Sequence, residues 1–80
     1  MSSDSKPTKT LDCIGLYCPE PVFQTRMALD ELKIGEVLGV VADDPAAEED
    51  IKRLVKRTGN KLLKVDKRDK VFNFLIRKVK

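Results

Sequence analysis

Histidine and tryptophan are absent from this sequence of 80 residues, and it contains only two cysteines, Cys13 and Cys18. The lack of histidine removes the side chain that most often serves as a general base and as a metal ligand. Two cysteines cannot build the disulfide framework of many small secreted domains, nor supply the four ligands of a structural zinc site. We therefore expect reduced thiols, no metal and no cofactor.

Long apolar segments are also missing from the sequence. No apolar run approaches the roughly 18 residues that are needed to cross a bilayer, and the chain does not begin with a basic and then apolar leader. These absences predict a soluble, cytoplasmic protein that makes no contact with membranes. A chain of this length suffices for one small domain with a single core.

Charge is unevenly distributed along the chain, although the formal net charge is only +3. Residues 1–50 contain four lysines and arginines against eleven aspartates and glutamates, whereas residues 51–80 contain twelve against two. Such an asymmetry can steer partners of either sign. One hypothesis is therefore a basic module that binds RNA or protein. Aromatic residues that could stack on bases are scarce, so direct nucleic-acid binding is not expected.

The pattern of apolar residues, prolines and glycines predicts six secondary-structure elements. Residues 1–8 are rich in Ser, Thr and Lys and are expected to form a flexible arm, and residues 9–80 to form the folded domain. The predicted elements are a strand from 9 to 12 or 13, a helix at 19–33, a strand at 36–42, a helix that begins at 45 and is ended by Gly59, and strands at 61–67 and 71–79.

This order, βαβαββ, predicts an α+β fold. Crossovers between parallel strands are right-handed in nearly all proteins, so two successive crossovers in one direction place both helices on the same face. The result is a two-layer sandwich of a four-stranded sheet and two helices. Sites in such sheets lie at the carboxyl ends of parallel strands. The turn containing Asp43 and Asp44 should therefore lie beside Cys18, and an antiparallel last strand would bring the basic turn at 67–70 to the same end, on the far edge of the sheet.

The first predicted helix carries two apolar surfaces. The stripe expected to face the core comprises Val22, Thr25, Ala28, Leu29 and Leu32. Phe23 and Met27 fall on another side of the helix. They either pack against a neighbouring loop or form an exposed apolar patch on which a partner protein docks.

Cys18 is the candidate nucleophile. Because proline is favoured in the first turn of a helix, Pro19 is expected to be the first helical residue, with Pro21 in the same turn and Cys18 as the cap. A thiol at the positive end of a helix dipole shifts toward the nucleophilic thiolate, whereas the carboxylate of Glu20 opposes that shift. The alternative is that Cys18 is a small buried apolar residue.

Several residues are expected to shape the turns around this cysteine. Asp12, Asp43 and Asp44 are expected to hold loop amides, as aspartates at turns do, or else to recognise a basic partner surface. Gly15 suits a turn that needs a positive φ. Tyr17 is expected to be a packing residue.

The run LDCIGLYCPEPV at residues 11–22 resembles the TusA/SirA-like sulfur-carrier family, and its Gly-Leu-x-Cys-Pro-x-Pro core is the most specific feature. With the ADDP turn at 42–45 and the FNFLI strand at 72–76, the resemblance extends over residues 9–80. It implies a mixed sheet in the order 1-2-4-3 with the last strand antiparallel. It also implies that Cys18 accepts sulfane sulfur as a persulfide from a cysteine desulfurase or rhodanese-like donor. The sulfur then passes to a downstream acceptor in tRNA thiolation, cofactor synthesis or sulfur metabolism.

Thiol exchange of this kind needs a partly ionised cysteine but no separate general base, so the absence of histidine fits the reaction. Cys13 goes beyond the family motif. It is expected either to pack at the end of the first strand or to act as a second thiol that attacks the persulfide on Cys18. A redox protein that uses both cysteines is the remaining hypothesis, although their spacing differs from Cys-x-x-Cys.

Overall fold

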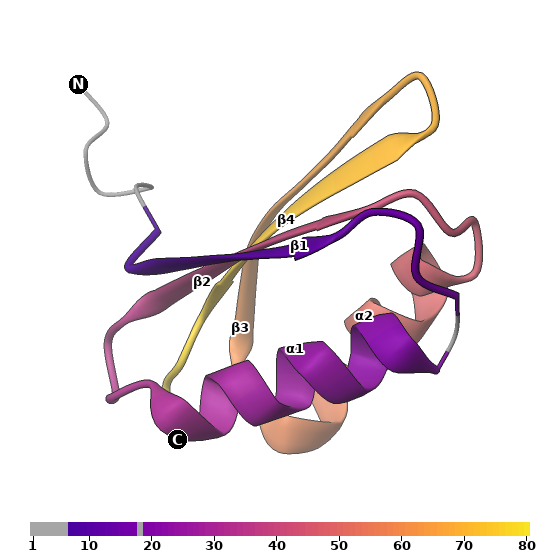
Figure 1. Ribbon diagram of the computed structural model, residues 1–80. Coiled ribbons are helices and arrows are strands. Elements are labelled where there is room, and N and C mark those ends of the chain that lie inside the picture. Colours follow the sequence, from indigo (N-terminus) through magenta and orange to yellow (C-terminus); the bar gives the residue numbers. More distant parts are fainter. Residues whose placement is uncertain (1–6, 18) are drawn as a thin grey trace, which may run out of the picture.

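Four strands and two helices follow one another in the predicted order (Figure 1). They are β1 (Lys9–Cys13), α1 (Glu20–Glu31), β2 (Val37–Ala42), α2 (Ala47–Thr58), β3 (Lys61–Arg68) and β4 (Val71–Arg77). The computed structural model describes residues 7–17 and 19–80. Residues 1–6 of the predicted arm and the predicted nucleophile Cys18 lie outside the described residues.

The sheet has the strand order β1-β2-β4-β3, which confirms the order that the family resemblance implies. β1 and β2 are parallel, whereas β4 runs antiparallel to both β2 and β3. Both helices cover the same face of the sheet, as the handedness of the crossovers predicts (Figure 1). The chain therefore forms the predicted two-layer α+β sandwich.

The core lies between the sheet and the two helices. β2 and β4 contribute three registered pairs of buried side chains from their inner faces: Leu38 with Ile76, Val40 with Phe74, and Ala42 with Phe72. The helices cover these pairs with Ala28 and Leu29 from α1 and with Ala47, Ile51 and Val55 from α2, and Leu32, the C-cap of α1, joins them. The stripe predicted on the first helix is therefore correct, except that Val22 is only half-buried.

The two described residues ahead of β1, Pro7 and Thr8, both contact β2. The Thr8 N–H donates to the Val37 carbonyl at 2.7 Å, and the Thr8 hydroxyl accepts from the Val37 N–H at 3.3 Å. A Cβ added at Gly39 would lie 3.3 Å from the Cβ of Pro7. The absence of a side chain at Gly39 thus lets Pro7 lie directly on β2.

α1 begins one residue later than predicted. Pro19 is its N-cap, with φ −99° and ψ 12°, and Pro21 is the buried second residue of the helix. The Pro19 carbonyl accepts the first helical hydrogen bond, from the Phe23 N–H at 3.0 Å. This is the role of an N-cap carbonyl, so the prediction that Cys18 is the cap and Pro19 the first helical residue is wrong.

α2 begins at Ala47, two residues later than predicted. The Asp44 carboxylate accepts the Ala46 N–H at 3.1 Å, and the Asp44 carbonyl accepts the Ala47 N–H at 2.9 Å. These two bonds form a separate turn around Pro45 and postpone the helix. The other boundaries agree with prediction within two residues. Among residues 7–17 and 19–80, no helix is long and apolar enough to span a membrane.

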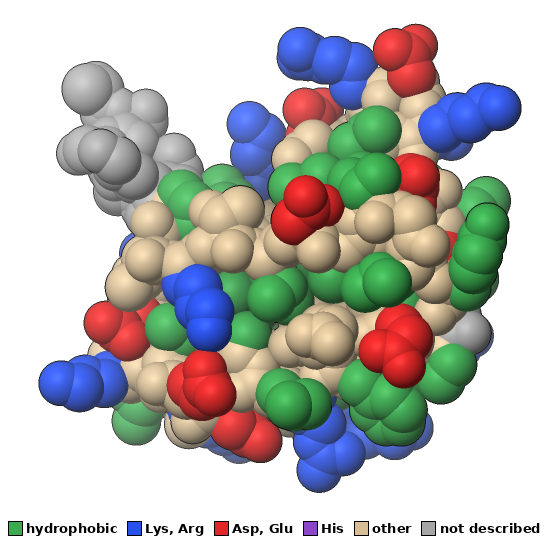
Figure 2. Space-filling view, in the orientation of Figure 1, with side chains coloured by type: hydrophobic (Ala, Val, Ile, Leu, Met, Phe, Trp, Pro, Cys, Tyr) green, Lys and Arg blue, Asp and Glu red, His purple; other side chains and the backbone are tan. Residues whose placement is uncertain are grey.

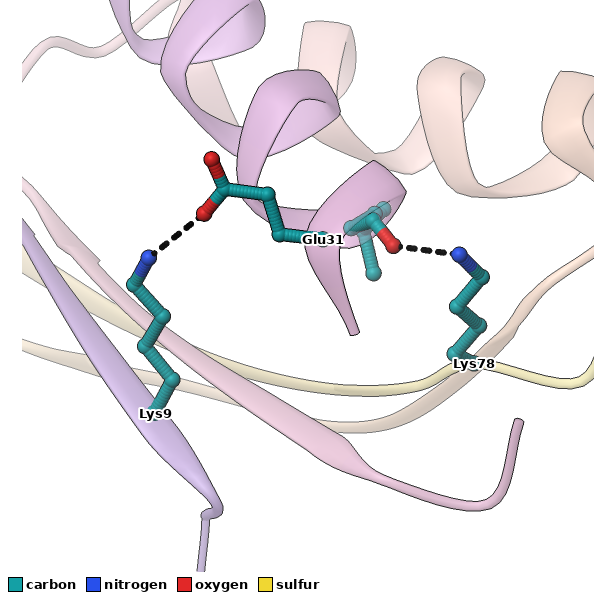
Figure 3. Close-up of polar contacts among 4 residues, drawn as sticks. Lys9, Glu31 and Lys78 are labelled. Carbon is teal, nitrogen blue, oxygen red and sulfur yellow. Dashed lines mark hydrogen bonds and ion pairs between the residues drawn. The ribbon is translucent and has the colours of Figure 1, made fainter. Parts of the chain in front are cut away.

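Two lysines hold the carboxyl end of α1 against the sheet (Figure 3). Lys9 on β1 pairs with the Glu31 carboxylate at 3.1 Å. Lys78, which follows β4, donates to the Leu29 carbonyl at 2.7 Å. Because the last turn of α1 contains no basic residue of its own, Lys78 supplies the cation that favours a helix carboxyl end.

We expect the core to tolerate truncation poorly. Ile76→Ala removes a side chain that is 0% exposed and should lower the free energy of unfolding by about 2–5 kcal/mol, because it leaves a cavity. Ile34→Ala makes the same change at a position that is 70% exposed and should shift stability by less than about 0.5 kcal/mol. Urea unfolding measures both, and equal losses would contradict this description of the core.

Candidate functional site

The β1–α1 and β2–α2 turns meet at the carboxyl ends of the two parallel strands (Figure 1). The Gly15 N–H in the first turn donates to the Asp43 carboxylate in the second at 2.9 Å. Gly15 has a φ of 84°, a backbone angle that residues other than glycine rarely adopt. This single bond joins residues 28 positions apart in the sequence and places the two turns side by side.

Backbone hydrogen bonds order the chain on both sides of Cys18, which itself lies outside the described residues. On the amino-terminal side, the Asp12 carboxylate accepts the Ile14 N–H at 3.0 Å, and the Leu16 N–H donates to the Cys13 carbonyl at 3.1 Å. Across the cysteine, the Glu20 N–H donates to the Tyr17 carbonyl at 2.8 Å. The described residues on both sides of Cys18 are therefore held by local hydrogen bonds.

Tyr17 does not pack against the fold, contrary to the prediction from sequence. Its side chain is 76% exposed. The preceding residue, Leu16, is the one that packs against the core. Leu16 thus takes the inward position, and Tyr17 is left on the surface, next to Cys18 in the sequence.

Cys13 is completely buried, with 0% of its surface exposed. It ends β1, pairs with Ala42 of β2 and belongs to the hydrophobic core. Burial, and secondarily the negative charge of Asp12, raises the pKa of the Cys13 thiol above its ordinary value of 9.0. Near neutral pH this thiol is protonated and enclosed. Because the thiolate is the nucleophilic form and must reach its target, Cys13 is an unreactive cysteine.

Phe23 and Met27 lie on the outer side of α1, where 54% and 60% of their surfaces are exposed. No described loop buries them, so the interpretation that they reach a neighbouring loop is wrong. Ile14 and Tyr17 are also exposed large apolar residues, and both belong to the β1–α1 turn. Figure 2 shows apolar side chains over the face formed by β1 and α1, with acidic side chains between them.

The β3–β4 turn lies at the same end of the sheet as the two β-to-α turns, as predicted. A groove of about 300 Å³ is lined by Asp43 and Pro45 from one side and by Lys67, Asp69, Lys70 and Phe72 from the other. The Lys67 ammonium lies 5.5 Å from the centre of the Phe72 ring. Within residues 7–17 and 19–80, no group of three or more His, Cys, Asp or Glu side chains could hold a metal ion.

A second groove near the cysteine was missed in the sequence analysis. It lies between α1 and α2 and is lined in part by Pro19, Arg53 and Arg57. The two arginines are four residues apart on α2, so their sharing of one helix face could have been predicted. Their position beside Pro19 depends on how the two helices pack, which the sequence pattern does not show.

The fold and the paired turns define a small α+β domain with a cysteine at a strand-to-helix connection. The chain belongs to the family described as sulfurtransferase TusA, whose family model matches residues 9–78. Membership makes it a sulfur-carrier protein, which exchanges sulfur with donor and acceptor partners.

Relatives and a solved structure support this assignment. A proposed sulfur carrier of Archaeoglobus fulgidus is 52% identical over 73 residues, which cover 90% of this chain and 95% of that protein. A similarly described protein of Aquifex aeolicus is 45% identical over 64 residues, which cover 80% of this chain but only 32% of that longer protein. The crystal structure of the SirA-like protein from Desulfitobacterium hafniense matches with a TM-score of 0.80 at 26% identity, covering 90% of this chain and 99% of the other.

Loss of the bond between the two turns should destabilise the protein. We expect Asp43→Ala to lower the free energy of unfolding by about 1–2 kcal/mol, because the Gly15 N–H loses a charged acceptor. The control is Asp30→Ala on the exposed surface of α1, which should change stability by less than about 0.5 kcal/mol. Similar losses from both substitutions, measured by urea unfolding, would argue against the bond as a link between the turns.

The raised pKa of Cys13 predicts a loss of stability at alkaline pH. As the pH rises past 9.0, the unfolded chain loses the Cys13 proton while the folded protein keeps it, so the free energy of unfolding falls. Unfolding curves from about pH 8 to about pH 10 should show the stability of the wild type falling more steeply than that of Cys13→Ala. Parallel pH profiles for the two proteins would mean that the burial of this thiol has no effect on its ionisation.

Proposed function

We propose that this protein carries sulfane sulfur as a persulfide on Cys18. The observation that carries the proposal is the complete burial of Cys13. The chain has only two thiols, and the enclosed one cannot meet a partner protein without unfolding. Cys18, within the Gly-Leu-x-Cys-Pro-x-Pro sequence and the matched family segment, is left as the thiol for exchange between proteins.

The proposed reaction is two successive thiol exchanges. In the first, the Cys18 thiolate attacks the outer sulfur of a donor persulfide, the sulfur–sulfur bond of the donor breaks, and the donor cysteine leaves as a thiolate. In the second, an acceptor thiolate attacks the outer sulfur on Cys18, and Cys18 leaves as a thiolate. The transferred sulfur keeps its proton in each step, so neither step needs a histidine or an external oxidant.

The neighbouring residues have supporting roles in this proposal. Asp12, Gly15 and Asp43 hold the first turn through the bonds described above, and Asp44 holds the second. Pro19, the N-cap, and Pro21, the second residue of α1, have no N–H, so fewer backbone donors at this helix end can hold the sulfur in place.

Phe23 and Met27 are proposed to dock a partner. They lie on the first two turns of α1, follow closely after Cys18 and expose more than half of their surfaces. Burying them against an apolar partner surface would contribute about 25 cal/mol for each Å² of apolar area removed from water. Phe23 follows Cys18 by only five residues in the sequence, so we propose that a donor or acceptor docked on this patch reaches the cysteine.

We place this exchange in the cytoplasm, where thiols stay reduced. The donor is a cysteine desulfurase or a rhodanese-like protein, and a downstream protein accepts the sulfur for tRNA thiolation, cofactor synthesis or sulfur metabolism.

The two alternative functions, RNA binding and a redox couple of the two cysteines, receive less support. Phe72 and Phe74 are buried and offer no surface for RNA bases to stack on, and the burial of Cys13 disfavours a Cys13–Cys18 redox couple.

The test is intact-mass spectrometry of the reduced protein after incubation with a cysteine desulfurase and cysteine. We expect a mass gain of one sulfur atom that dithiothreitol removes, because a persulfide is reducible. Cys13→Ala should keep the gain and Cys18→Ser should lose it. Transfer that survives in Cys18→Ser, or that fails with desulfurase, rhodanese and tetrathionate alike, would refute sulfur carriage on Cys18.

A further inference from the structure

The groove between α1 and α2 has a volume of about 260 Å³ and borders the residue that follows Cys18. Its lining combines apolar and charged side chains: Pro19, Val22, Asp50, Arg53, Leu54 and Arg57. Leu54 is buried and Val22 half-buried, so they form an apolar floor. The charged groups come from α2 alone and stand at the rim.

The charges in this groove are of both signs. Arg53 pairs with the Asp50 carboxylate at 3.5 Å. Arg57 lies one turn further along α2, and in the described part of the chain it forms none of the observed ion pairs. A guanidinium recognises a carboxylate through paired N–H donors, while an aspartate accepts from an ammonium group. The rim therefore offers a partner of each sign to a small ligand that carries both a carboxylate and an ammonium group.

The position of the groove relates it to sulfur exchange. Pro19 lines the groove and is joined to Cys18 by one peptide bond, and Cα atoms joined in this way are only a few ångströms apart. An amino acid held at the rim by its charged groups would lay its side-chain methylene on Val22 and Leu54. A sulfur atom at the end of that side chain would then be directed toward the start of α1.

We propose that this groove binds a free α-amino-acid persulfide, such as cysteine persulfide, as a small-molecule sulfur donor. Arg57 receives the α-carboxylate, and Asp50 receives the α-ammonium group. The Cys18 thiolate attacks the outer sulfur, the sulfur–sulfur bond of the small persulfide breaks, and cysteine leaves as a thiolate, so that Cys18 becomes the persulfide. The inference rests on the proposed function of Cys18 but requires no protein donor.

The experiment compares the rates at which two small persulfides load Cys18. Cysteine persulfide carries both charged groups, whereas 2-hydroxyethyl persulfide is uncharged at the corresponding positions. Each is added to wild type, to Arg57→Gln and to Arg68→Gln, an exposed arginine in β3 that does not line the groove. Trapping with iodoacetamide and chymotryptic cleavage after Tyr17 places Cys13 and Cys18 on separate peptides for mass spectrometry.

We expect Arg57→Gln to slow loading from subsaturating cysteine persulfide by about tenfold, because a charged hydrogen bond to the carboxylate is lost. Loading from 2-hydroxyethyl persulfide should be unchanged, and Arg68→Gln should match wild type with both donors. The loading rate of each variant is divided by that of wild type with the same persulfide, so that the different intrinsic reactivities of the two persulfides cancel. N-acetylcysteine persulfide, which lacks the ammonium group, should load wild type more slowly than cysteine persulfide does.

Two results would overturn the inference. One is an equal effect of Arg57→Gln on both persulfides, and the other is an equal effect of Arg57→Gln and Arg68→Gln on cysteine persulfide. If a cysteine desulfurase still loads Cys18 in the same preparations, only the amino-acid groove is wrong. If no donor of either kind places sulfur on Cys18, the proposed function itself is wrong.

Discussion

The central position of β2 is the constraint on which the rest of this structure depends. β2 pairs with β1 on one side and with β4 on the other, and Val37 to Val40 are all buried. One face of the strand supports the helices, and the other is covered in part by Pro7, which approaches because residue 39 is a glycine. The chain of 80 residues has one small core, and β2 runs through it. The carboxyl end of β2 leads into the β2–α2 turn, and its parallel pairing with β1 places the β1–α1 turn at the same end.

The two cysteines show how position along a strand separates chemical roles. Cys13 is the last residue of β1 and pairs with Ala42, and both residues belong to the hydrophobic core. The Cys13 thiol is therefore enclosed, and it stays protonated near neutral pH. Cys18 comes only five residues later, beyond a turn that Gly15 and Asp43 hold. Sulfur exchange requires a thiol that can meet another sulfur, so the enclosed Cys13 is structural and Cys18 is the thiol that we propose for the exchange.

The start of α1 is bordered by two surfaces of different character. On the outer side, Phe23 and Met27 are apolar and exposed, which suits a protein partner. On the side of α2, the groove with Arg57 carries charge, which suits a small ionic ligand. A carrier that must both receive and release sulfur benefits from such a difference, because donor and acceptor need not compete for the same contacts. The charge asymmetry of the sequence contributes here, since both groove arginines belong to its basic half.

Much of the fold could be predicted from local pattern. The order of elements, the two-layer arrangement and the buried stripe of α1 follow from apolar periodicity and crossover handedness, which are properties of short segments and of chain chirality. The helix starts were wrong by one or two residues. The hydrogen bonds of Pro19 and Asp44 decide those starts, and helix ends are the part of an element that local pattern defines least well.

The sequence by itself determined the family and the candidate nucleophile, because a cysteine before two alternating prolines is a local chemical feature, and the strand order followed only from the family resemblance. Only the tertiary structure decided which apolar residues stay exposed, that Cys13 is enclosed, and that Arg57 and Pro19 border one groove. It also brought Lys78 to the end of α1, 49 residues away along the chain. These outcomes depend on packing between segments that are distant in the sequence. The residue pattern within one segment does not predict which of its surfaces the other segments will cover.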